Sequence, residues 1–173
     1  MEEIGKMQSV KPKEITDNYI KLIGEKWMLV TAGDPAGFNM MTASWGGAGF
    51  LWNKPVVFVF IRPQRHTFGF IEKNDEFTLS FFEEQYRPAL TVCGSVSGRD
   101  TDKVEASGLT PCKTEEGNVS FKEARLVLEC RKLYAEFLNP DAFIDPKILK
   151  DFYPGKDYHK VYVAEIVNAW EKK

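Results

Sequence analysis

The stretch that decides the fold is KPVVFVFIRPQRHT, residues 54–67. Its apolar run over residues 55–61 has the length and the valine and phenylalanine content of a buried strand. Two arginines, a histidine and a threonine follow at once, and Thr67 is a candidate cap for a helix over residues 65–73. Because backbone N–H groups are free where a helix begins, this junction predicts an anion site.

Extended and short helical segments continue this pattern on both sides. The strand over residues 125–137 places Leu126, Leu128 and Cys130 on one face and Glu129 on the other, and residues 76–82 alternate as a half-buried strand does. Strands at meander spacing with short helices between them predict a mainly β fold with helical insertions, arranged as an antiparallel barrel. The other expected elements are a hairpin of residues 27–33 and 38–45, a last strand over 160–170, and helices over 86–96 and 100–108.

Composition bounds the class of protein and its partners. The 173 residues carry a net charge of -2, so no basic field favours nucleic acid or an anionic membrane. We expect one domain over residues 1–173, with residues 1–12 as a polar N-terminal arm. No run approaches the roughly 20 apolar residues that span a bilayer. An N-terminus without an apolar signal segment, and three cysteines without a CxxC pair, indicate free thiols and a cytoplasmic location.

The usual catalytic motifs are missing from the sequence. It contains no GxGxxG, no Walker motif and no GxSxG, and its two histidines and dispersed cysteines form no metal-ligand set. We therefore assign no catalytic residue and no metal, and we expect the chemistry to come from a bound cofactor.

Three segments concentrate anion-binding side chains: residues 39–45, 62–67 and 97–103. Arginine, lysine and hydroxyl groups recognise phosphate, and the aromatic, glycine-rich residues 45–52 offer a flat apolar surface. A phosphate joined to a planar ring would satisfy both features. Each segment taken alone has another interpretation: arginines paired with surface carboxylates, Asp100 or Thr101 capping a helix, and Trp45 and Trp52 as core or interface residues.

The order of four motifs resembles a known family. NMMTASWGG (39–47), KPVVFVFIRPQRHT (54–67), EFTLSFF (76–82) and SGRDTDK (97–103) are similar to motifs of the flavin reductase-like proteins, especially their flavoredoxin-like branch. The resemblance covers residues 27–170 and implies a split β-barrel that binds FMN at a homodimer interface. By position it assigns the flavin ring and ribityl chain to Thr42, Ala43, Ser44 and Trp45, the phosphate to Arg62, Arg65, His66 and Thr67, and an added charge to Lys103.

The resemblance leaves two functions open. One is transfer of electrons from NADH or NADPH through bound FMN to free flavin or another small acceptor, with donor and acceptor visiting the same flavin face in turn. The other is an FMN-holding electron carrier with a protein donor and little nicotinamide activity. The segment over residues 139–149 has no derived role, although beside a flavin it could form a wall or lid.

Overall fold

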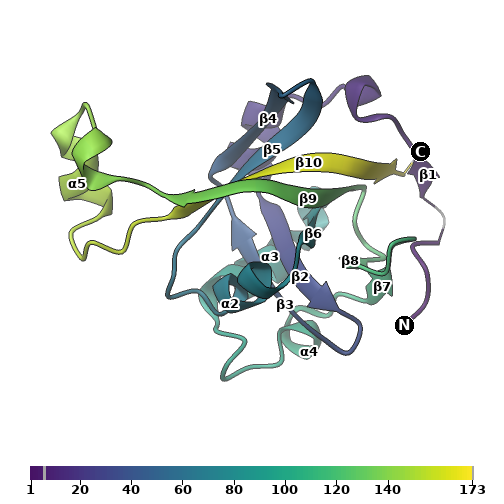
Figure 1. The fold of residues 1–173 in the computed structure, drawn as a ribbon. Helices are drawn as coiled ribbons and strands as arrows, with labels where there is room; N and C mark the ends of the chain where they lie inside the picture. Colours follow the sequence, from purple (N-terminus) through teal and green to yellow (C-terminus); the bar gives the residue numbers. More distant parts are fainter. Residues whose placement is uncertain (6, 173) are drawn as a thin grey trace.

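One antiparallel eight-stranded sheet forms the body of the protein in this computed structural model, which describes residues 1–5 and 7–172 (Figure 1). The strands follow the spatial order β3-β2-β6-β9-β10-β5-β4, and β1 pairs with β10. Their bounds are β1 Gln8–Ser9, β2 Met28–Asp34, β3 Gly37–Ala43, β4 Gly46–Leu51, β5 Lys54–Ile61, β6 Glu76–Phe81, β9 Leu126–Phe137 and β10 Lys160–Glu171.

The two outermost strands of this order, β3 and β4, are neighbours in the chain. Only Ser44 and Trp45 separate the end of β3 at Ala43 from the start of β4 at Gly46. So short a connection between the outermost strands requires the sheet to curl until its edges meet. The predicted mainly β barrel is therefore confirmed, and its open seam lies between β3 and β4.

Strand β4 was not predicted, because its glycines hide the strand pattern. Gly47 pairs with Phe58 of β5, and Gly49 pairs with Val56. The ring of Phe58 lies 3.8 Å from the place where a Cβ of Gly47 would stand, and 3.9 Å from that of Gly49. The aromatic ring of the neighbouring strand therefore covers the backbone of both glycines at van der Waals distance.

Apolar side chains fill the barrel and a second core outside it. The prediction that residues 76–82 form a half-buried strand is wrong, because β6 is buried on both faces. A hairpin of β7 (Pro111–Lys113) and β8 (Val119–Phe121) covers its outer face, where the Thr78 hydroxyl donates to the Val119 carbonyl. The barrel core includes Met28, Val30, Val59, Phe77, Leu79, Leu126, Leu128, Cys130 and Tyr162, and the outer core includes Leu29, Met40, Leu90, Cys93, Val127 and Trp170.

The three helices predicted over residues 65–73, 86–96 and 100–108 are present, with different caps, and two further α-helices were not predicted. No side chain caps α2, whose N-cap is Arg65, so the predicted capping by Thr67 is wrong. Asp102 caps α4 by accepting from the N–H groups of Val104 and Glu105. The helices are α1 Tyr19–Lys21, α2 His66–Lys73, α3 Arg87–Ser95, α4 Lys103–Ser107 and α5 Pro146–Phe152, with short turns η1 Pro12–Glu14, η2 Leu22–Lys26, η3 Glu84–Tyr86 and η4 Pro140–Ala142.

Strands β9 and β10 run beyond the barrel as a two-stranded ribbon that carries η4 and α5, at the left of Figure 1. The segment 139–149, which had no predicted role, lies in this projecting arm, and no residue of α5 is buried. Arg62 ties the arm to the barrel through Asp157 and the Phe152 carbonyl. No helix of the described chain is long and apolar enough to cross a membrane.

Candidate functional site

Two adjoining hollows near the barrel seam contain the residues that the sequence predicted. The seam hollow, of about 210 Å³, is lined by Met41, Thr42, Ala43, Ser44, Trp45, Phe60, Arg62, Arg65 and His159. The cation hollow, of about 140 Å³, is lined by Gln64, Arg65, His66, Thr67, Ser95, Val96, Ser97, Arg99 and Lys103. Arg65 lines both, so a ligand that fills both hollows passes its guanidinium.

In the part of the chain that the structure describes, the cations of the cation hollow lack carboxylate partners. Elsewhere in the protein Arg62, Arg87, Arg125 and Arg131 pair with Asp157, Glu84, Asp17 and Glu165. Among the described residues, no carboxylate lies within 4.0 Å of Arg65, Arg99 or Lys103. Since a buried or half-buried charge is costly without a counter-charge, this unbalanced cluster suits an anionic ligand.

Backbone carbonyls hold two of these cations in place. Lys103 is 5% exposed, and its Nζ donates to the carbonyls of Met40 and Cys93, at 2.8 Å each. Arg65 Nη2 donates to the Gly94 carbonyl at 3.0 Å. Cys93 and Gly94 lie in the last turn of helix α3, where cations are favoured, so the side chains of Lys103 and Arg65 also stabilise that helix end. These bonds use two of three ammonium hydrogens and one of five guanidinium hydrogens, which leaves donors for an anion.

The start of helix α2 adds to the anion preference. A helix N-terminus favours acidic side chains or a polar cap, but here Arg65 and His66 occupy these positions and no side chain caps the helix. Burial and the charges of Arg99 and Lys103 lower the pKa of His66, so its ring is neutral at pH 7. Burial, and then the charge of Arg65, lower the pKa of Lys103 to about 8.

Close packing at Gly98 brings the three predicted anion-binding segments together. A Cβ at Gly98 would lie 2.0 Å from Asn39 Oδ1 and 3.2 Å from His66 Cδ2. Asn39 in turn donates from Nδ2 to the hydroxyl of Thr67, at 2.7 Å. Glycine therefore lets the loop of residues 97–103 lie against both other segments.

The seam hollow presents backbone groups and aromatic rings. Asp34 and Gly37 face each other across the β2–β3 turn as a hydrogen-bonded pair. Because hydrogen-bonded pairs alternate along an antiparallel ladder, the backbone N–H and C=O groups of Asn39, Met41 and Ala43 are the ones that bond to β2. Thr42 therefore turns its backbone N–H and C=O to the free edge of β3, while its hydroxyl donates to the Leu90 carbonyl. Trp45 is 43% exposed and contacts Phe152 edge-on, with 5.4 Å between ring centroids.

Arg62 lies apart from the other predicted phosphate ligands. Its guanidinium pairs with Asp157, donates to the Phe152 carbonyl at 2.8 Å and lies over the Tyr153 ring at 5.2 Å. It lines the seam hollow and is not among the residues that line the cation hollow. The structure thus divides RPQRHT, because Arg62 holds the arm and lines only the seam hollow, whereas Arg65, His66 and Thr67 line the cation hollow. Gln64 does both, since it lines the cation hollow and donates to Asp157 of the arm.

Two titratable residues that line the hollows, Arg99 and His159, were not selected from the sequence. Arg99 lies inside the predicted segment 97–103, so its position could have been found from the sequence. His159 had no local signal, because contacts far along the chain place it. Its Nδ1 lies 2.8 Å from the Tyr153 hydroxyl, and its ring centroid lies 5.1 Å from that of Trp45. Burial, and then the charge of Arg62, lower the pKa of His159 to about 4.

The donor set indicates which ligands fit. Arg65 and Lys103, which have no carboxylate partner among the described residues, lie beside the uncapped start of α2 and suit a phosphate. The free backbone at the edge of β3 and the indole ring of Trp45 suit a planar heterocycle. No group of three or more metal-ligating side chains occurs among residues 1–5 and 7–172. The arrangement fits a phosphorylated planar cofactor such as FMN.

Comparison with known proteins gives the family. A family model described as "Flavin reductase like domain" matches residues 21–173. An FMN-binding domain of a flavin reductases-like enzyme from Shewanella baltica has a TM-score of 0.70 at 18% identity, over 96% of this chain and 77% of that one. Flavoredoxin from Methanosarcina acetivorans has a TM-score of 0.66 at 23% identity, over 86% and 69%.

A third solved structure is the NADH:FAD oxidoreductase of Streptomyces globisporus in complex with NAD and FAD fragments, with a TM-score of 0.63 at 17% identity, over 84% of this chain and 75% of that one. At these identities the likeness shows the fold alone. No curated protein matches the chain.

Proposed function

The chain belongs to the flavin reductase like domain family, and from that premise we propose that it binds FMN and transfers electrons from NADH or NADPH to free flavin or another small acceptor. The observation that carries the proposal is the cation hollow, where Arg65, Arg99 and Lys103 have no carboxylate partner within residues 1–5 and 7–172. The FMN phosphate lies there, against Arg65, His66, Thr67 and Lys103. FMN, when bound, supplies the redox chemistry by accepting hydride at N5 and releasing electrons to the acceptor.

The seam hollow holds the ring of the cofactor in this proposal. The backbone of Thr42 and Ser44 offers hydrogen bonds to the heteroatoms of the ring, Ala43 lines the hollow between them, and Trp45 forms an apolar wall. Burial raises the pKa of Tyr153, so its hydroxyl keeps its proton in the hydrogen bond of 2.8 Å that it shares with His159 Nδ1. Burial and the charge of Arg62 keep His159 uncharged at the wall of the hollow.

Anaerobic absorbance tests the reaction. FMN-loaded protein mixed with NADH or NADPH is expected to lose its flavin band within seconds. Because one open face serves donor and acceptor in turn, steady-state rates should give parallel double-reciprocal lines as the acceptor is varied. If neither nucleotide bleaches the band over many minutes while a reduced ferredoxin does, the electron-carrier function replaces the reductase.

FMN affinity is expected to depend on pH through Lys103. Its ammonium attracts phosphate only while protonated, and its pKa in the free protein is about 8. Affinity is therefore fully present below pH 8 and falls as pH rises, by up to roughly tenfold per pH unit, as the linkage of one proton requires. Equilibrium dialysis from pH 7 to 10 measures this. Riboflavin binding should stay flat, and Lys103→Met should abolish the slope; a slope that survives in this variant contradicts the assignment.

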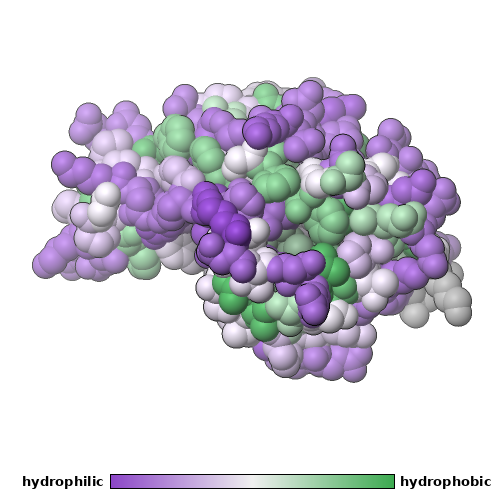
Figure 2. All heavy atoms as spheres, turned by 90° about the horizontal axis from the view of Figure 1, so that it is seen from below, coloured by the Kyte–Doolittle hydropathy of each residue, from purple (hydrophilic) through white to green (hydrophobic). Residues whose placement is uncertain are grey.

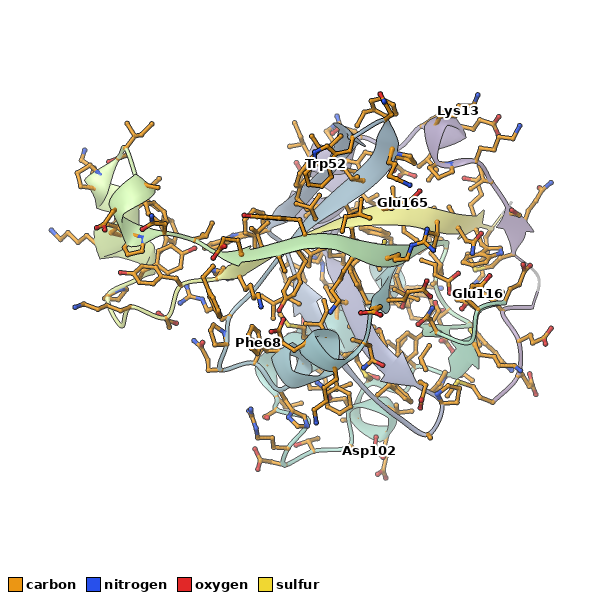
Figure 3. All side chains as sticks on the ribbon, in the orientation of Figure 1. Lys13, Trp52, Phe68, Asp102, Glu116 and Glu165 are labelled. Atoms are coloured by element: carbon orange, nitrogen blue, oxygen red, sulfur yellow. The ribbon has the colours of Figure 1, made fainter. Side chains whose placement is uncertain are left out.

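We also propose a homodimer. The seam hollow, at about 210 Å³, is small for a tricyclic ring, so a second copy would complete its walls. Large apolar side chains are exposed on β4, its turn and the ribbon: Phe50 is 73% exposed, Trp52 55% and Tyr134 47%. In Figure 3, Trp52 lies above strands β9 and β10. The opposite face, which Figure 2 shows from below, mixes hydrophobic and hydrophilic groups.

Light scattering at micromolar concentration is expected to give about twice the chain mass of 19.8 kDa. Trp52→Glu should shift the mass toward one chain and weaken FMN binding in parallel. A wild-type monomer that still holds FMN tightly contradicts the dimer.

The three cysteines, Cys93, Cys112 and Cys130, are free and buried, and a reducing cytoplasm stays a prediction from the sequence.

A further inference from the structure

A cluster of charged and hydroxyl groups that line neither hollow lies at the far end of helix α2. Glu72 accepts from the Tyr162 hydroxyl at 2.7 Å and from Lys160 Nζ at 2.8 Å, and both donors belong to β10. Lys132 of β9 donates to the Ile71 carbonyl at 2.8 Å. Tyr162 is 0% exposed, so it reaches Glu72 from inside the barrel. We call Glu72, Lys160 and Tyr162 the helix clamp.

The position of Glu72 in the helix is unfavourable by itself. Helix α2 ends at Lys73, and the carbonyls at the C-terminal end of a helix carry partial negative charge, which disfavours an acidic side chain there. Burial raises the pKa of Glu72, but the hydrogen bonds from Lys160 and Tyr162 outweigh burial, so the pKa lies below its usual value. The carboxylate is therefore charged at neutral pH, and the two donors on β10 stabilise it in this place.

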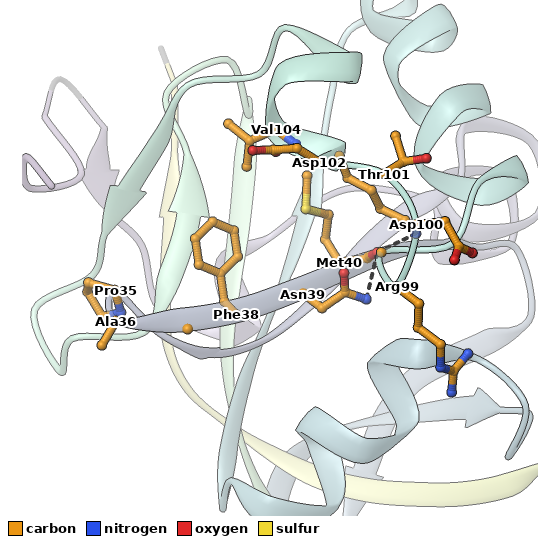
Figure 4. A pocket seen from close by; sticks show the side chains of 13 residues that line it. Pro35, Ala36, Phe38, Asn39, Met40, Arg99, Asp100, Thr101, Asp102 and Val104 are labelled. Atoms are coloured by element: carbon orange, nitrogen blue, oxygen red, sulfur yellow. Dashed lines mark hydrogen bonds between the residues drawn. The ribbon is translucent and has the colours of Figure 1, made fainter.

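The start of the same helix is bonded to a different part of the barrel. Asn39 of β3 donates from Nδ2 to the Thr67 hydroxyl at 2.7 Å, and Arg99 donates to the Gln64 carbonyl at 3.2 Å. Figure 4 shows Asn39 on β3 and Arg99 on the loop of residues 97–103. Helix α2 is thus bonded to the edge strand β3 at its start and to β10 at its end, below the ribbon of β9 and β10 in Figure 1.

Apolar contacts hold the helix face but not its place along the axis. Among the residues of α2, all of which the structure describes, Thr67 and Ile71 are the buried ones. Burial of apolar surface is non-directional, so two such contacts fix which side of the helix faces the barrel. Hydrogen bonds depend on distance and angle, so the contacts at the two ends fix how far α2 stands from β10.

Both hollows depend on where this helix stands. The first turn of α2 supplies His66 and Thr67 to the cation hollow. His159, which directly precedes Lys160 and the start of β10, lines the seam hollow. We propose that Glu72 is a positioning residue, which fixes α2 to β10 and so holds the two hollows at the separation that one ligand needs to fill both. The inference rests on the proposed function, in which the phosphate and the ring of FMN occupy the two hollows.

A ligand with two joined halves shows this role. Each half binds its own hollow, and the joined ligand gains affinity over its halves only while the spacing of the hollows matches its length. Loss of the helix clamp lets α2 shift relative to β10, which leaves each hollow intact but misplaces one relative to the other. A residue that merely stabilised the fold would affect the joined ligand and its halves alike.

The experiment compares FMN with riboflavin and inorganic phosphate in wild type, Glu72→Ala and Glu72→Gln, by flavin fluorescence titration and calorimetry. In Glu72→Ala, FMN affinity should fall about tenfold, while the affinities for riboflavin and for phosphate stay within about twofold. Glu72→Gln keeps one carbonyl acceptor and should lose about threefold for FMN. The matched control is Glu84→Ala, which breaks an exposed glutamate–lysine pair of 3.0 Å with Lys26 that lines neither hollow, and it should bind all three ligands as wild type does.

Two results of this comparison overturn the inference. One is an equal fall for FMN and riboflavin, which would mean that Glu72 supports the whole fold. The other is a phosphate affinity that falls as far as the FMN affinity, which would mean that Glu72 shapes the cation hollow alone.

Amide hydrogen exchange of the ligand-free protein separates failure of this inference from failure of the proposed function. Glu72→Ala should speed exchange in α2 about tenfold and leave β2 and β6 unchanged, and Tyr162→Phe, which removes only the hydroxyl, should give part of this effect. If exchange in α2 does not change, the helix clamp is overturned even where wild type binds FMN. If exchange rises as expected but wild type binds FMN no better than riboflavin, the helix clamp stands and the flavin assignment falls.

Discussion

Replacing Arg65 by alanine is expected to lower FMN affinity by about two to three orders of magnitude and to leave riboflavin binding within a few-fold of wild type. The guanidinium lines both hollows and has no carboxylate partner among the described residues, so its free donors are available to the phosphate. Losing a charge-assisted contact of this kind inside a binding site costs about 3 to 4 kcal/mol. Fluorescence titration with the two flavins measures the difference.

The control for this prediction is Arg131→Ala, which removes an arginine that is 51% exposed and paired with Glu165 away from the hollows. Its FMN affinity should match wild type. Because Arg65 also donates to the end of helix α3, retained riboflavin binding shows that Arg65→Ala still folds. A parallel fall for FMN and riboflavin would mean that Arg65 supports the fold without contacting phosphate.

Glu129→Ala is expected to lower the free energy of unfolding by about 3 to 5 kcal/mol, since it leaves buried donors without an acceptor. The Glu129 side chain is 0% exposed and accepts from the Thr114 hydroxyl and from Asn118 Nδ2 and Asn168 Nδ2, both at 2.8 Å. These bonds join β9 to the β7–β8 hairpin and to β10. Urea unfolding followed by far-ultraviolet circular dichroism measures the change.

Glu116→Ala is the matched control, because this glutamate is exposed in the turn between β7 and β8 (Figure 3). Its unfolding free energy should stay within about 0.5 kcal/mol of wild type. Glu129→Gln keeps the shape of the side chain and should fall between the two. If Glu129→Ala unfolds at the wild-type urea concentration, the donors found other partners and the buried network contributes little.

Six of the strands, three of the helices and the three anion-binding segments could be predicted from the sequence because they depend on short-range pattern. The apolar run before Arg62 predicted β5, and two arginines, a histidine and a threonine at a strand end beside a helix start predicted an anion at residues 62–67. Strand β4 was not predicted because its glycines carry no side chains, and Phe58 of another strand covers them instead. The burial of Glu129 was not predicted because Asn168, which donates to it, lies 39 positions away in the sequence.

Local sequence by itself determined that the chain forms a mainly β protein with free cationic groups at strand and helix ends. Only the tertiary structure decided which cations share a hollow. Arg62 and Arg65 are three positions apart, yet Asp157, 95 positions after Arg62, pairs with the first and leaves the second without a carboxylate partner among the described residues. His159 joins the seam hollow through the same arm. The physical reason is that charge pairing and burial depend on distance in space, and a curled sheet sets these distances between segments far apart in the chain.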